Sequence, residues 1–244
     1  MGYEPRTYRG VVTPAGLTTF EVAIKETDLQ ISALSDLTGP AEDLVAQARW
    51  QIESYITANP RFAETWVPIE VADDAPDLVR TMARAAHLAR VGPMAAVAGV
   101  VAEYVARGLA PLSAEVVVEN GGDIYLVGTA ERTIALWAGK SSLTGKVGLR
   151  IPAGLTPVAV CTSSGTVGHS ASLGVADGAT VVAHDGALAD AVATALANRV
   201  HSPEDIQRAI DACKAINGVL GLLVVVGGHL GAWGNIHLTA LEPS

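Results

Sequence analysis

The chain has 244 residues, of which 50% are hydrophobic and 17% are charged, so it can build a large core, and global disorder is excluded. Its 16 Lys and Arg residues against 25 Asp and Glu residues give a net charge of −9, the wrong sign for binding nucleic acid through its phosphates. We therefore expect no nucleic-acid partner, and the length favours one domain over residues 1–244.

The first half of the chain carries strand signals followed by helix signals. Residues 8–12 and 18–33 are rich in β-branched and aromatic side chains, with a turn at Thr13-Pro14-Ala15-Gly16 between them, which predicts strands and a hairpin. Apolar residues at helical spacing then predict three helices, over residues 40–56, 77–90 and 94–107. The third is almost entirely small or apolar, so we expect it to be surrounded by protein.

The second half begins with short strands and returns to helices before the last strands. The predicted strands are residues 115–118, 123–127, 133–137, 147–151, 157–160, 179–183, 219–226 and 236–240. One helix is predicted over residues 186–198 with Asp185 as its N-cap, and Ser202-Pro203 opens another that Asn217-Gly218 closes.

The N-terminus and the apolar stretches bear on localisation. The chain opens with charge and proline rather than the apolar run of a signal peptide. Its longest apolar stretches, residues 91–102 and 218–228, are shorter than the roughly 20 residues of a membrane-spanning helix. We expect a cytoplasmic protein without membrane contact, and we interpret Cys161 and Cys213 as buried thiols.

The helix over residues 186–198 carries a carboxylate and a hydroxyl on one face. Asp190 and Thr194 are four residues apart among small and apolar neighbours, so they project from the same side. Two hard oxygen donors suit Mg²⁺, which takes its remaining oxygens from water and substrate phosphates. The alternative is a buried Asp190 that is satisfied by Thr194 or by a backbone amide.

Three further segments could contact a ligand. Residues 161–170 hold five hydroxyls and two glycines after a predicted strand, which suits a phosphate or a flavin edge but is more often typical of a tight turn. Within them, His169 is either a general base or a structural histidine. Asn120-Gly121-Gly122-Asp123 predicts a hairpin turn whose glycines permit close approach. Residues 92–99 start a helix without side-chain bulk, which favours either a phosphate site or tight packing.

Taken in chain order, these segments resemble the ApbE-like superfamily, whose best-known members are Mg²⁺-dependent FAD:protein FMN transferases. The resemblance covers roughly residues 92–198, and the helix with Ala189-Asp190-Ala191-Val192-Ala193-Thr194-Ala195-Leu196 is its most specific part. It implies an α+β fold with a mixed, largely antiparallel sheet flanked by helices. It also implies Asp190, Thr194 and a carbonyl near Val97 as metal ligands.

The resemblance further implies FAD and Mg²⁺ as cofactors and a protein as the acceptor of FMN. The residues implied at the flavin nucleotide are Gly99, Asn120, Gly121, Gly122, Asp123, Thr162, Ser163, Ser164 and Gly165, with His169 and Asp190 as catalytic candidates. The family lysine is replaced by Ala98, and the family's His-Ile-x-Asp-Pro stretch is missing.

Two functions therefore stay open. The first is a flavin-nucleotide protein with Mg²⁺-dependent FMN transfer or FAD pyrophosphatase activity, and the second is a non-catalytic module that binds a flavin, a nucleotide or another anionic metabolite. The sequence leaves the oligomeric state open, homo-oligomers included.

Overall fold

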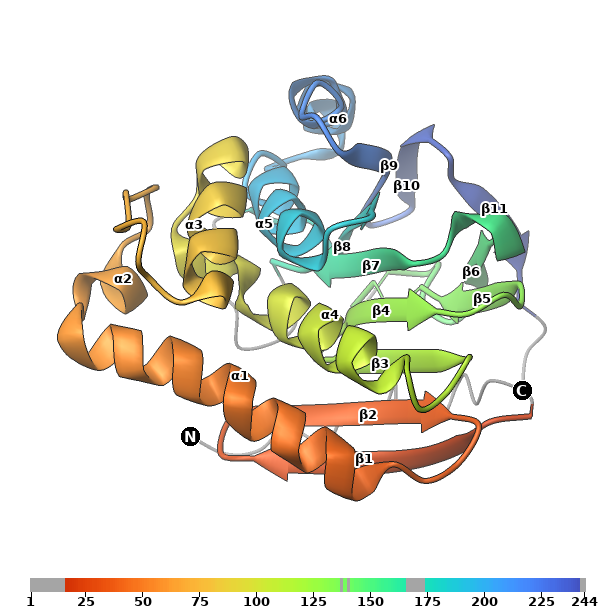
Figure 1. The fold of residues 1–244 in the computed structure, drawn as a ribbon. Coiled ribbons are helices and arrows are strands. Elements are labelled where there is room, and N and C mark those ends of the chain that lie inside the picture. The colour runs from red at the N-terminus through yellow and green to blue at the C-terminus, as the bar shows by residue number, and fades with distance from the viewer. Residues whose placement is uncertain (1–15, 137, 140, 166–173, 242–244) are drawn as a thin grey trace.

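An eight-stranded sheet forms the centre of the computed structural model (Figure 1). The structure describes residues 16–136, 138–139, 141–165 and 174–241. In spatial order the strands are β1 (Thr18–Ile24), β2 (Thr27–Ala33), β3 (Val116–Asn120), β4 (Asp123–Val127), β7 (Val158–Ser163), β8 (Gly178–Ala183), β9 (Val219–Val226) and β10 (His229–Gly234). Each pairing in this sheet is antiparallel.

The α-helices cover one face of this sheet. They are α1 (Thr38–Ala58), α2 (Arg61–Glu64), α3 (Asp77–Ala89), α4 (Val97–Leu109), α5 (Gly186–Ala197) and α6 (Ile206–Cys213). The short 3₁₀ helices are η1 (Pro93–Ala96), η2 (Ala153–Leu155) and η3 (Pro203–Asp205), and Leu155 of η2 packs on the opposite face of the sheet. Figure 1 shows α1 along β1 and β2, and α4 and α5 side by side over the middle strands. Every residue of α5 except Thr194 is buried, so this helix lies inside the molecule.

A smaller antiparallel sheet covers part of the opposite face. It consists of β5 (Arg132–Ala135), β6 (Val147–Ile151) and β11 (His237–Ala240), in the order β11-β6-β5. Leu149 and Ile151 of β6 pack with Val158, Val160 and other residues of the large sheet in a second hydrophobic cluster. The middle strands are thus buried on both faces, which explains why β7 and β8 are apolar along almost their whole length.

The structure confirms the predicted α+β class and most of the predicted elements, with some differences. The segment 18–33 is two strands that fold back at Lys25, whose φ of 53° is left-handed. Strand β7 continues to Ser163, so Cys161 to Ser163 belong to a strand rather than to the predicted loop. Strand β10 and helix α2 were not predicted. The predicted strand 8–12 lies outside the described residues.

Both cysteines are free and buried, as predicted. Across the described part of the chain, no helix on its own has the length and apolar character to cross a bilayer. Among the described helices, α3 together with the Pro93–Leu109 segment passes by length and composition, as a pair bent by 103°.

Candidate functional site

The β3–β4 hairpin brings two polar side chains to the helix-covered face of the sheet. Asn120 and Asp123 are paired across the turn, and strand alternation buries both of them between apolar neighbours. The two turn residues, Gly121 and Gly122, have φ values of 68° and 104°, which glycine adopts without strain. The turn is the predicted one, and it places Asn120 and Asp123 under the start of α4.

The start of α4 is fixed to both the hairpin and α5. Asn120 Nδ2 donates to the Ala98 carbonyl at 3.1 Å, and the Gly99 amide donates to Asp190 Oδ2 at 2.9 Å. The first amides of a helix have no acceptor within the helix, so Asp190 supplies one that α4 needs. Asn120, Gly99 and Asp190, which are far apart in the sequence, therefore meet at one point.

Two glycines allow this approach, because α4 and α5 cross with backbone against backbone. A Cβ on Gly99 would lie 2.1 Å from the Gly186 carbonyl oxygen and 2.7 Å from Asp190 Cβ. A Cβ on Gly186 would lie 2.5 Å from the Gly99 oxygen. Only glycine fits at either position, and the contact is what brings Asp190 within reach of the Gly99 amide.

Asp190 and Asp123 form a pair of buried carboxyl groups. Asp190 is 9% exposed and Asp123 is 7% exposed. Burial raises the pKa of Asp190 to about 7, although its hydrogen bonds from the Gly99 and Ala98 amides work in the other direction. Burial and the nearby Asp190 raise the pKa of Asp123 well above its usual range. Two such groups favour a shared proton or a bound cation.

The end of β7 adds a backbone amide and a hydroxyl. The Thr162 amide donates to Asp123 Oδ1 at 3.1 Å. The Thr162 hydroxyl forms a hydrogen bond with the Thr180 hydroxyl on β8. Ser163 lies on the same strand face as Cys161, whose sulfur is 3.8 Å from the Gly186 oxygen, so Ser163 faces α5. Ser163 Oγ is buried without a hydrogen-bond partner among the described residues. This hydroxyl is available to a ligand.

The remaining predicted residues lie just beyond β7, on α5 and at the start of α4. Ser164 is half-buried and Gly165 is exposed just beyond β7, and the Gly165 amide donates to the Ala176 carbonyl. Thr194 is half-buried one turn beyond Asp190, and Val97 is half-buried at the first position of α4. His169 lies outside the described residues.

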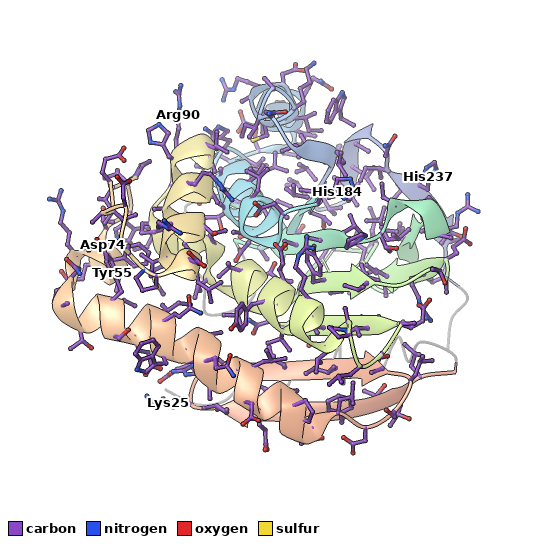
Figure 2. All side chains as sticks on the ribbon, viewed as in Figure 1. Lys25, Tyr55, Asp74, Arg90, His184 and His237 are labelled. Carbon is purple, nitrogen blue, oxygen red and sulfur yellow. The ribbon has the colours of Figure 1, made fainter. Side chains whose placement is uncertain are left out.

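The donor set suits a hard cation that also needs oxygens from elsewhere. In the described ranges, no three His, Cys, Asp or Glu side chains come close enough together to hold a metal. Figure 2 shows His184, just before α5, well separated from His237 on β11. Asp190, Asp123, hydroxyls and carbonyls are oxygen donors, which is the chemistry of Mg²⁺ rather than of zinc.

Glu103 is a residue of this region that the sequence analysis missed. Its carboxylate accepts from the Gly186 amide at 2.6 Å, from Arg107 Nε at 2.6 Å and from the Tyr125 hydroxyl at 3.2 Å. It therefore caps the N-terminus of α5 from α4 and supports the crossing of the two helices. The signal was present, since Glu103 is the only acid in the apolar segment 94–107.

Comparisons with known proteins agree with this architecture. A family model described as "AbpE bacteria" matches residues 11–228. A UPF0280 protein of Methanocaldococcus jannaschii is 40% identical over 223 residues, covering 88% of this chain and 90% of that protein. A UPF0280 protein of Methanocella arvoryzae is 38% identical over 219 residues, covering 89% of each.

Solved structures share the fold at low sequence identity. The flavin transferase ApbE from Vibrio cholerae has a TM-score of 0.59 at 12% identity, covering 90% of this chain and 97% of that one. The ApbE protein from Thermotoga maritima has a TM-score of 0.58 at 13% identity, covering 88% of this chain and 96% of that one. The likeness extends over nearly the whole length of both.

Proposed function

Because the chain belongs to the family described as "AbpE bacteria", we propose that it binds a flavin nucleotide, FAD, together with Mg²⁺ where α4, α5 and the β3–β4 hairpin meet. The observation that carries the proposal is the buried pair Asp190 and Asp123. Two desolvated carboxyl groups near each other are costly to ionise unless a positive charge accompanies them. The same fold in flavin transferases supports the choice of ligand.

In this proposal, the metal ligands are Asp190, Thr194 and a main-chain carbonyl near Val97. Asp123 adds negative charge beside them, and its own position is fixed by the Thr162 amide. Mg²⁺ bound there would neutralise charge on the pyrophosphate as the nucleotide leaves. Asn120 holds the first turn of α4 through the Ala98 carbonyl, so the carbonyls of that turn are pre-oriented.

The flavin nucleotide would lie along the hairpin and the end of β7. Ser163 Oγ, which is buried and without a hydrogen-bond partner among the described residues, would donate to a phosphate. Ser164 and Gly165 extend the same wall, and Gly121 and Gly122 form the opposite one.

The reaction we propose is FMN transfer from FAD to a hydroxyl of an acceptor protein or to water. The attacking oxygen forms a bond to the phosphorus of FMN, the pyrophosphate P–O bond breaks, and AMP departs with the bridging oxygen. His169 would take the proton of the attacking hydroxyl.

The second candidate is a binding module without transfer chemistry. It is favoured by Ala98 in place of the family lysine and by the hydrogen bond from the Gly99 amide to Asp190, which gives that carboxylate a structural role. In this case the same residues would hold a flavin, a nucleotide or another anionic metabolite, and the ligand would stay intact.

Incubation of the purified protein with FAD and Mg²⁺ tests both candidates. We expect Mg²⁺-dependent FAD binding by calorimetry and release of AMP by chromatography. Asp190→Asn should abolish the Mg²⁺ dependence, whereas Asp43→Asn on the exposed face of α1 should leave it unchanged. FAD binding without AMP release selects the binding module, and absence of any FAD binding with Mg²⁺ overturns the proposal.

A further inference from the structure

Strand β10 forms an open edge of the large sheet. Within the described residues it pairs with β9 alone, and all six residues from His229 to Gly234 pair in unbroken register. An edge strand presents unpaired amides and carbonyls along its outer side, where another strand can bind. In Figure 1, β10 lies on the side of the molecule away from α1 and α2.

The usual protections against edge pairing are missing from β10. The segment between Lys214 and Glu242, which includes β10, contains no Asp, Glu, Lys, Arg or Pro. Natural edge strands carry such residues, or bulges, to prevent pairing with another chain. The opposite edge strand, β1, contains Glu21. Each edge strand is packed on one face by a helix, β1 by α1 and β10 by α6, so what distinguishes β10 among the described residues is its lack of charge.

Large apolar side chains are exposed around the same edge. Leu230 and Trp233, which strand alternation places on opposite faces of β10, are 37% and 36% exposed. Each could pack against a side chain of an added strand on its own face of the sheet. We call this surface the β10 edge (Leu230 and Trp233 with the β10 backbone).

We propose that the β10 edge binds a second copy of this chain, so that two β10 strands pair antiparallel about a two-fold axis. A two-fold interface requires the same surface on both sides, and an uncharged strand that meets itself brings no like charges together. Each copy carries a net charge of −9, so copies repel over most of their surface and meet least repulsion at the charge-free segment. The dimer then has one continuous sheet across both subunits.

The pairing leaves the candidate site free. In the large sheet β10 is three strands away from β7, which corresponds to about 14 Å at roughly 4.8 Å per strand. Dimerisation through β10 therefore does not depend on flavin binding, and an experiment can contradict either one while the other holds.

Sedimentation analysis of the purified protein and of Leu230→Lys tests the inference. We expect twice the mass of one chain for the native protein, and a dimer dissociation constant raised by about tenfold or more in Leu230→Lys, because each copy would bring a charged ammonium group out of water at the interface. Leu112→Lys, at another exposed leucine, is the matched control and should remain dimeric. Circular dichroism checks that each variant is folded.

Hydrogen exchange locates the interface. Amides of residues 229–234 should exchange more slowly at concentrations where the native protein is dimeric than in Leu230→Lys. A monomeric native protein overturns the proposal, as does a dimer whose stability Leu230→Lys does not change. Protection of β10 by a different protein, with no self-association, would identify another occupant and also overturn it.

Discussion

Asp190 has a structural role that does not depend on any ligand. Its Oδ2 accepts from the Gly99 amide at 2.9 Å, so it caps the first turn of α4 from a neighbouring helix. A hydrogen bond of this kind contributes about 1 kcal/mol, while burial of the charge opposes folding by more. The residue is therefore stabilising when protonated or beside a cation, and costly when ionised alone.

This balance predicts how stability changes with pH. Burial raises the pKa of Asp190 from 3.8 to about 7, so the folded protein binds the proton more tightly than the unfolded chain. The stabilisation is fully present below the unfolded value and is lost as the pH rises through about 7. Without divalent cations, the free energy of unfolding should fall over this window, and Asp190→Asn should reduce the fall by up to about 4 kcal/mol.

Urea denaturation in EDTA at several pH values measures this effect. The Asn amide oxygen can still accept from Gly99, so the variant removes the charge and keeps the cap. Asp123 retains its own raised pKa, so part of the pH dependence should remain. Asp43→Asn should follow the native profile, and a parallel profile for Asp190→Asn would refute a raised pKa at Asp190.

At the scale of elements, the α4–α5 crossing makes a sharp prediction for Gly99→Ala. The added Cβ would lie 2.1 Å from the Gly186 carbonyl oxygen, so the two helices must separate. We expect a loss of roughly 1–3 kcal/mol in the free energy of unfolding, measured by urea denaturation. Gly39→Ala in α1 is the matched control, because nothing lies within 4 Å of its Cβ, and its stability should stay equal or rise slightly. Equal stabilities of the two variants would contradict the tight crossing.

Elements with a strong local signal were predictable from the sequence, and elements that depend on neighbours were not. The N-cap at Asp185 is confirmed, since its Oδ1 accepts from the Leu188 amide at 2.9 Å. Strand β10 contains two glycines and an alanine, which have little intrinsic strand preference, so its conformation depends on pairing with β9. The fold-back at Lys25 has no glycine or asparagine at the left-handed position to indicate it.

At the scale of the molecule, the candidate site depends on contacts between distant segments. The sequence predicted the turn at Gly121 and Gly122 and singled out Asp190, because both have local signals. It did not predict that Asp190 would lie close enough to Asp123 to raise the pKa of Asp123, or that Glu103 would cap α5. Both depend on how closely α4 and α5 approach each other where they cross, and no local sequence pattern encodes that distance.

The charge of the whole molecule predicts how the proposed dimer responds to salt. Two copies of net charge −9 repel, and the repulsion is screened as the Debye length shortens from about 30 Å at 0.01 M to about 8 Å at 0.15 M ionic strength. The β10 edge contains no ion pair to be weakened, because no Asp, Glu, Lys or Arg lies between Lys214 and Glu242. The dimer dissociation constant should therefore fall as salt is raised, in sedimentation experiments on the native protein. A dissociation constant that rises with salt would show that charged groups hold the copies together, in a contact other than the β10 edge.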